Sequence, residues 1–244
     1  MVALTVRIII TNLRGDILVK YGTHDLIEED INIVKKFTNL PLGSWLVGYR
    51  YLKYLIWRGD FSYTFGIIER SLSEIDYYPP VQYVGERFEK LYEGMKEMVE
   101  RGERKFDGFR SVIQDILANF VKVSEVITFR TDPSIIELKP GEKAWIRYIF
   151  SFKRDIEERV MVISINNAYP EHLVEATGVG SYSEGNIQLN RVITYPQTHF
   201  DVEFRAKNVK GHWYLPPIAQ ITIGDKHAPI SSENVLEVIV REGE

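Results

Sequence analysis

The chain has 244 residues, of which 45% are hydrophobic and 26% charged, and its net charge is −4. This composition is typical of a globular chain with enough apolar residues for one large or two ordinary domains. The slightly acidic balance gives no electrostatic reason to expect a nucleic-acid partner. The absence of cysteine excludes disulfides, thiolate metal ligands and cysteine nucleophiles.

The tripeptide Arg-Gly-Asp occurs twice, at 14–16 and 58–60, and we interpret both copies as hairpin turns rather than adhesion signals. Glycine takes a positive φ at low cost and aspartate tolerates turn geometry. β-prone residues run up to each tripeptide and resume after it, at 6–10 and 17–21 and again at 54–57 and 61–67.

An adhesion role would also need export. The opening MVALTVRIII lacks the basic segment and long apolar core of a signal peptide, so we expect a first strand there. No stretch approaches the roughly 18 consecutive apolar residues of a membrane-spanning helix. A cytoplasmic protein is therefore expected.

The rest of the first half alternates helical and strand patterns. The spacing of apolar residues predicts a helix over 23–37, then three strands, or two with a bend, within 44–70. After a break at Pro79 and Pro80, a helix is expected from 81 to its stop at Gly102. A further helix follows over 106–121. The predicted order, ββαβββαα, indicates an antiparallel sheet covered by helices, which is an α+β fold.

Three segments carry a resemblance to a known family: IIITNLRGDILVKYG, GSWLVGYRYLKYLIWRGDFSYTFGIIE and FDGFRSVIQDILANF. They are similar to the longin fold, closest to the small (sigma) chains and the N-terminal parts of the medium (mu) chains of clathrin-adaptor complexes. One departure is SLSEIDYYPPVQYVG, where that family usually enters its helix sooner. The resemblance covers residues 4–120, and it implies a longin-like domain over 1–122 without a catalytic signature.

The second half, 123–244, carries the whole net negative charge and has a different texture. SIIELKPGEKAWIRYIFSF alternates around a turn at Pro140 and Gly141. Short strands at regular spacing follow, with no helical pattern between them. This predicts an all-β, immunoglobulin-like sandwich over 123–244, although the cysteine pair of antibody domains is absent.

Signatures of catalysis are weak throughout. His199, His212 and His227 are 13 and 15 residues apart and form no HxH or HExxH pair, so isolated histidines are expected rather than metal ligands. The acidic run 28–30 occupies the first turn of a predicted helix, where the macrodipole explains it. GVGSYSEG at 178–185 lacks the lysine and helix of a phosphate loop. We expect no catalytic residues, no cofactor and no metal.

Two segments are candidates for protein binding. RYLKYLIWR interleaves Arg50, Lys53 and Arg58 with aromatic residues, a pattern that also suits anionic lipid, nucleic acid or simply a two-faced strand. HWYLPP places Trp213 and Tyr214 on opposite faces of a pleat, so that one of them faces solvent. The candidate binding residues are Arg50, Lys53, Arg58, His212, Trp213 and Tyr214.

Together these patterns predict a non-enzymatic adaptor or scaffold of longin type that mediates protein–protein interactions. The resemblance implies protein partners such as small GTPases or coat-like subunits, homo- or hetero-oligomers, membrane association only through partners, and a place in vesicle trafficking. Two alternatives stay open. One is a surface or envelope module whose sandwich binds glycan or protein, and the other is an enzyme with a scattered site.

Overall fold

The computed structural model describes residues 6–22, 28–166, 174–178, 181–183, 186–207, 210–215 and 217–241. It divides into two compact units, Met1–Val121 and Lys122–Glu244. This division lies one residue from the boundary expected at 122/123. Each unit has its own sheets and is described by itself.

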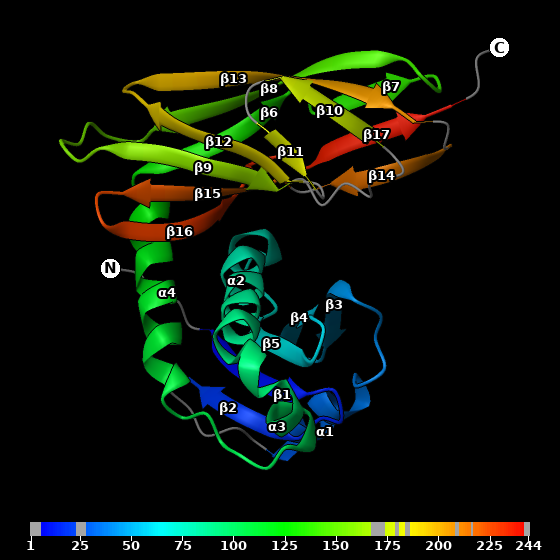
Figure 1. Ribbon diagram of the computed structural model, residues 1–244, viewed down its shortest axis with the longest axis vertical. Helices are drawn as coiled ribbons and strands as arrows, with labels where there is room; N and C mark the ends of the chain where they lie inside the picture. Colours follow the sequence, from blue (N-terminus) through cyan, green and yellow to red (C-terminus); the bar gives the residue numbers. More distant parts are fainter. Residues whose placement is uncertain are drawn as a thin grey trace. The chain divides into compact units, whose positions relative to one another are not determined.

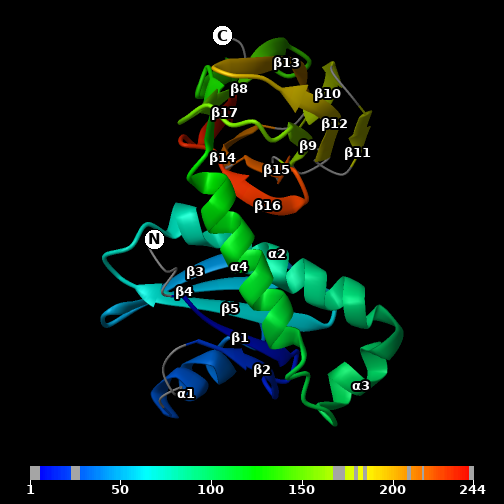
Figure 2. The same cartoon turned by 90° about the vertical axis from the view of Figure 1, so that its left-hand side faces the viewer.

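The first unit contains a five-stranded antiparallel sheet in the order β2-β1-β5-β4-β3 (Figure 2). The strand order is not the chain order, because β5 lies between β1 and β4 and so joins two hairpins into one sheet. Strand β3 is one edge of this sheet and β2 is the other. The strands are β1 (Arg7–Asn12), β2 (Ile17–Tyr21), β3 (Gly43–Tyr49), β4 (Leu52–Arg58) and β5 (Ser62–Glu69).

Helices cover both faces of this sheet (Figures 1 and 2). Helix α1 (Glu28–Lys36) packs Ile33 and Val34 on the face that carries Ile9, Tyr54, Ile56, Tyr63, Phe65 and Ile67. On the opposite face, α2 (Glu74–Tyr92) and α4 (Phe109–Ser124) bury Val84, Phe88, Phe109 and Ile113 against Ile8, Ile10, Leu18, Leu55 and Ile68. Two apolar layers, one on each face, therefore hold the unit together.

Helix α2 corrects one prediction. Pro79 and Pro80 do not break the chain there, because the helix begins at Glu74 and contains both of them. Proline in a helix interior removes a backbone donor and costs about 3 kcal/mol. Both prolines are buried, as are Tyr77, Val81 and Val84, so burial of this first half of the helix against the sheet offsets that cost. The predicted stop at Gly102 is confirmed. After η1 (Glu93–Met95), helix α3 (Lys96–Arg101) ends at its C-cap Gly102, which has φ +66°.

The structure confirms that both Arg-Gly-Asp tripeptides lie in hairpin turns. In the first turn, the Asn12 side chain accepts hydrogen bonds through Oδ1 from the backbone N–H groups of Arg14 (3.0 Å) and Asp16 (2.9 Å). Gly15 adopts φ +86°, a region that favours glycine. The turn is thus closed by the local bonding that asparagine typically provides.

A carboxylate from helix α2 holds the second turn. Glu89 Oε1 accepts hydrogen bonds from the backbone N–H of Phe61 (3.0 Å), and from both the N–H (2.9 Å) and the hydroxyl (2.8 Å) of Ser62. Its Oε2 accepts from the N–H of Asp60 at 3.0 Å. Arg58 is half-buried at the end of β4. This tripeptide is part of the junction between a hairpin and a helix rather than a protruding loop.

We expect Glu89→Gln to lower the free energy of unfolding by about 1 kcal/mol, because the amide keeps one acceptor but loses the charge that strengthens these bonds. Urea denaturation measures the change. Glu86→Gln is the matched control, since Glu86 lies one turn earlier on α2 and bonds to the Gln82 side chain at the surface. An equal loss for both variants would contradict the assigned role of Glu89.

The second unit is built of strands in the part of the chain that the structure describes, apart from the end of α4. Figure 1 shows the sheet β10-β13-β8-β6 lying over the sheet β11-β12-β9-β15-β16, and a third sheet has the order β14-β17-β7. The strands are β6 (Ile127–Asp132), β7 (Ile135–Leu138), β8 (Lys143–Phe152), β9 (Val160–Asn166), β10 (Val174–Gly178), β11 (Ser181–Ser183), β12 (Asn186–Ile193), β13 (Gln197–Ala206), β14 (Gly211–Leu215), β15 (Ile218–Ile223), β16 (Lys226–Ser231) and β17 (Leu236–Val240).

The expected fold class, α+β with a longin-like sheet and an immunoglobulin-like sandwich, is wrong for this chain. The described residues form seventeen strands against four α-helices and one 3-10 turn, in several mostly antiparallel sheets. The chain is therefore mostly β, and more β-rich than an α+β longin fold. Sequence patterns located most elements but assigned the class from the first half, where the helices gather.

The turn at Pro140 and Gly141 also differs from a simple hairpin. Strand β7 before the turn pairs in parallel with β17, about a hundred residues later in the chain, whereas β8 after the turn pairs with β6 and β13. The turn therefore moves the chain from one sheet to another.

None of the helices in the described residues is both long enough and apolar enough to cross a membrane.

Candidate protein-interaction edge

Strand β3 is the most exposed strand of the first sheet. Six of its seven residues are exposed, and none of them carries a charge. Large apolar side chains are among them: Trp45 is 37% exposed, Leu46 49% and Tyr49 37%. Leu42 and Tyr51 flank the strand and are also exposed. Edge strands of this kind present backbone donors, acceptors and apolar surface to another chain.

Both apolar layers of the unit reach this edge. Trp45 and Val47 lie opposite Ile56 and Tyr54 of β4, which belong to the layer under α1. Leu46 lies opposite Leu55, which belongs to the layer under α2. The exposed side chains of β3 therefore continue the core on both faces.

The opposite edge, β2, is protected. The register between β1 and β2 shifts at Ile10 and Thr11, and the exposed Lys20 lies on the edge strand. The segment before α4 then covers the strand: the Phe106 N–H donates to the carbonyl of Leu18 at 3.0 Å, and the Lys105 ammonium donates to the carbonyl of Ile17. Bulges, lysines and covering segments are the usual protection of sheet edges. By contrast, β3 pairs with β4 over seven consecutive residues without a register shift.

The three predicted basic residues lie along the β3–β4 hairpin but do not form one patch. Arg50 is exposed in the turn, has φ +53°, and stacks its guanidinium over the Tyr49 ring at 5.3 Å. Arg58 is half-buried, with its guanidinium 5.9 Å from the Tyr63 ring centroid. Lys53, between them in the sequence, bonds to other residues of the unit.

The Lys53 ammonium has two internal partners. It donates to the Leu72 carbonyl at 2.8 Å and to Glu74 Oε2 at 2.6 Å. The hydrogen bond from Lys53 lowers the pKa of the Glu74 carboxyl. Lys53 therefore ties β4 to the start of α2 instead of offering its charge to a ligand.

In the second unit, β14 positions His212, Trp213 and Tyr214. Tyr214 is 66% exposed, and its ring lies 4.6 Å from that of His212 on the same face of the strand. The His212 Nε2 bonds to Glu237 Oε1 on the neighbouring β17. Trp213 is half-buried on the other face, against Gly211. The prediction that one of the two adjacent aromatic residues is exposed is confirmed, and it is Tyr214.

The three histidines of the second half that were weighed as metal ligands do not come together. His199, His212 and His227 lie on β13, β14 and β16, which belong to three different sheets. Within the described ranges, no group of three or more His, Cys, Asp or Glu side chains is arranged to hold a metal ion. The segment 178–185 lies partly outside the described residues, and its 181–183 form β11.

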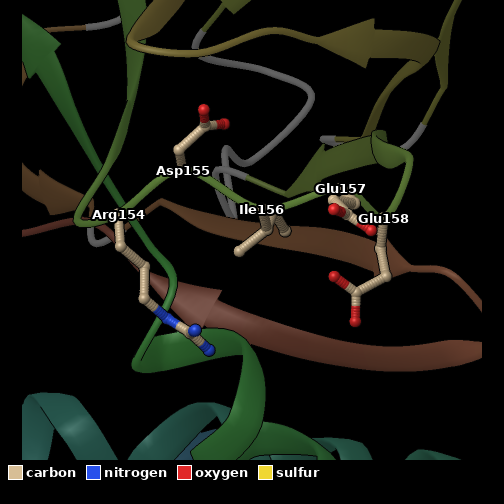
Figure 3. Close-up of a pocket in the computed structure, with 5 residues that line it drawn as sticks. All are labelled: Arg154, Asp155, Ile156, Glu157 and Glu158. Atoms are coloured by element: carbon tan, nitrogen blue, oxygen red, sulfur yellow. The ribbon is translucent and has the colours of Figure 1, made fainter.

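The second unit has a hollow of about 710 Å³ along the loop that joins β8 to β9. Its lining is five consecutive residues, Arg154, Asp155, Ile156, Glu157 and Glu158. In Figure 3 the side chains of Arg154 and Asp155 extend in opposite directions, and the carboxylate of Glu158 points away from that of Asp155. Acid–base catalysis and ion binding both need groups that converge on one point, whereas Arg154, Asp155 and Glu158 point apart.

The sequence analysis missed two features. It identified 44–49 as strand but did not identify it as the exposed edge, although the absence of charge across LGSWLVGY was a visible signal. It assigned Asp30 to the helix dipole, whereas Asp30 is buried and accepts hydrogen bonds from Arg7 and Tyr54. The side chains of Glu28 and Glu29 lie outside the described residues.

Comparison with known proteins gives no family. No protein family matches the chain, and no curated protein matches it. Among solved structures, it is similar to domains 4 and 5 of the S-layer protein SbsC, at 15% identity and a TM-score of 0.23, over 46% of this chain and 50% of that one. A longer SbsC structure, rSbsC(31-844), has 15% identity and a TM-score of 0.25, over 48% of this chain and 13% of that one.

A family 123 glycoside hydrolase from Clostridium perfringens has 6% identity and a TM-score of 0.26, over 48% of this chain and 28% of that one. The chain thus spans half or less of these three structures. At such TM-scores none of these similarities carries an argument about function.

Proposed function

We propose that this protein is a non-enzymatic adaptor or scaffold that binds protein partners by strand addition at β3. The observation that carries the proposal is an uncharged, bulge-free edge strand whose large apolar side chains continue both core layers of its unit. Main-chain hydrogen bonds supply affinity in strand addition, and alternate side chains supply specificity. We place its action in the cytoplasm, with any membrane association made through partners.

From the sequence similarity of residues 4–120 alone, we infer that coat-like subunits or small GTPases are partner classes. In this proposal, Arg50 and Lys53 of the β3–β4 hairpin position the edge strand and do not contact the partner. Arg50 lies in the turn after β3, and Lys53 ties the neighbouring strand β4 to the start of α2. The exposed pair on β14 is not needed for binding at β3 and serves as an internal control.

A comparative affinity purification from the source cells tests the proposal, with wild type, Leu46→Lys and Tyr214→Lys as baits. Leu46→Lys places a charge in the middle of the edge and is expected to reduce capture of partners about tenfold or more, because a charge on an edge strand opposes pairing. Tyr214→Lys changes a more exposed strand residue in the other unit and should capture the same partners as wild type. Partners captured equally by all three baits would contradict the proposal.

A further inference from the structure

We propose that the strand that adds to β3 is the β3 of a second copy of this chain, antiparallel to the first, with a two-fold axis at Leu46. This inference rests on the proposed function, in which β3 is the binding edge, and it names the occupant of that edge. Two five-stranded sheets would then continue across the axis as one.

The side chains of β3 are complementary to themselves in this register. Pairing about Leu46 sets Trp45 opposite Val47 of the second copy and Tyr49 opposite Gly43. Aromatic residues pair well with β-branched residues across strands, and an aromatic ring covers a facing glycine. Leu46 meets its own copy. The large exposed side chains thus face smaller residues, and none meets a residue of equal bulk except at the axis.

The backbone also permits this register. In an antiparallel strand the N–H and C=O groups of alternate residues point to the same side. The register pairs residues of like parity, Ser44 with Gly48 and Trp45 with Val47, so groups that point to the same side meet. Because β3 has no bulge against β4, its outer side is regular along all seven residues.

Electrostatic repulsion does not oppose the pairing of the two β3 strands. Residues 43–49 carry no charge, and the first charged residue after them, Arg50, falls opposite Leu42 of the second copy. Like charges therefore do not meet along the pair. Within the described residues, the single chain protects β2 by a bulge, a lysine and a covering segment, and β3 shows none of these three. A closed two-fold pair protects β3 as well, because an isologous contact uses the same surface on both copies and ends the assembly at two.

Sedimentation of the full chain over a wide range of concentrations is the first test. Wild type is expected to shift from monomer to dimer as concentration rises. Leu46→Lys brings two ammonium groups together at the axis and should raise the dimer dissociation constant on the order of a hundredfold. Tyr214→Lys should dimerise as wild type does. Circular dichroism checks that each variant is folded, which we expect because Leu46 is half-exposed in the monomer.

The absence of cysteine makes the register itself testable. Leu46→Cys should form an intermolecular disulfide under mild oxidation, because directly opposed residues have Cα atoms about 4.5–5.5 Å apart, within the range that a disulfide spans. Ser44→Cys should not, since its two copies would lie about 13 Å apart along the strands. The double variant Ser44→Cys, Gly48→Cys should cross-link again, because these residues are opposed.

Two results would overturn self-pairing, and a third would overturn its register. A chain that stays monomeric and does not cross-link overturns it, and if Leu46→Lys still abolishes capture of a different protein, the proposed function survives. A dimer that Leu46→Lys leaves intact overturns it by placing the contact elsewhere. Equal cross-linking of Leu46→Cys and Ser44→Cys overturns the register. If wild type forms no dimer, and Leu46→Lys captures the same partners as wild type, the inference and the proposed function are both rejected.

Discussion

Replacing Asp30 by alanine is expected to lower the free energy of unfolding of the first unit by about 3–5 kcal/mol. Its carboxylate is buried in α1 and accepts two hydrogen bonds, from Arg7 Nη1 at 2.6 Å and from the Tyr54 hydroxyl at 2.7 Å. The Asp30 side chain is 2% exposed and that of Arg7 is 16% exposed. Three elements, β1, α1 and β4, therefore meet at one carboxylate.

The size of the effect comes from what the substitution leaves behind. Without Asp30, the guanidinium of Arg7 keeps its largely buried position and loses this ion-pair partner, and the buried Tyr54 hydroxyl loses the Asp30 carboxylate as an acceptor. Breaking one side of a buried ion pair costs more than the pair contributes, because the remaining charge is desolvated and uncompensated. Tyr54→Phe removes the hydrogen bond to Asp30 but leaves the charge of Arg7 paired, and should cost about 1 kcal/mol.

Urea denaturation followed by circular dichroism measures these losses. Asp107→Ala is the matched control, because Asp107 pairs with Arg110 at 2.9 Å at the surface of the same unit. Exposed pairs contribute about 0–1 kcal/mol, so the control should stay close to wild type. If Asp30→Ala were no less stable than Asp107→Ala, the three-way contact would not bear on stability.

Asp30 also shows where sequence reasoning stops. Its position near the start of a predicted helix has a sufficient local explanation in the helix dipole. Its partners Arg7 and Tyr54 are 23 and 24 residues away and come from two different strands. Nothing in the local pattern links the three. The periodicity that predicted each element predicts which face is apolar, and not which polar group is buried with it.

The hairpins could be predicted because their determinants are local. Each Arg-Gly-Asp turn lies between β-prone runs, and those runs pair with each other. The edge position of β3 follows instead from the insertion of β5 between β1 and β4, and the parallel pairing of β7 with β17 joins opposite ends of a unit. Such long-range pairings are set by the packing of the whole domain, and sequence periodicity does not encode them.

The pair Pro79 and Pro80 is the opposite case, a strong local signal that packing overrides. Taken alone, two prolines predict a helix boundary, since the residue before a proline disfavours the helical region. Here the buried face of α2 runs through them, from Tyr77 to Phe88. The close approach of this helix to the sheet depends on glycines, because an added Cβ at Gly85 would meet the Trp57 ring.

Gly85→Ala is expected to destabilise the first unit by about 2 kcal/mol, although alanine is the better helix former. A Cβ at Gly85 would lie 2.1 Å from Cε3 of the Trp57 ring and 2.8 Å from Oγ1 of Thr64. The ring cannot simply turn aside, because a Cβ at Gly59 would also meet it, at 2.4 Å. The helix must therefore move away from β4 and β5, and buried contacts along its length are lost.

The sign of this effect distinguishes packing from helix propensity. Gly94 lies in η1 with nothing within 4 Å of an added Cβ, so Gly94→Ala should be neutral or stabilise by up to about 1 kcal/mol. Trp57→Leu removes the obstructing ring, and in that background Gly85→Ala should cost less than in wild type. Urea denaturation of wild type, Gly85→Ala, Trp57→Leu and the double variant gives the coupling free energy between the two sites. A stabilising Gly85→Ala, or a cost unchanged by Trp57→Leu, would mean that α2 does not approach the sheet as closely as Gly85 and Trp57 require.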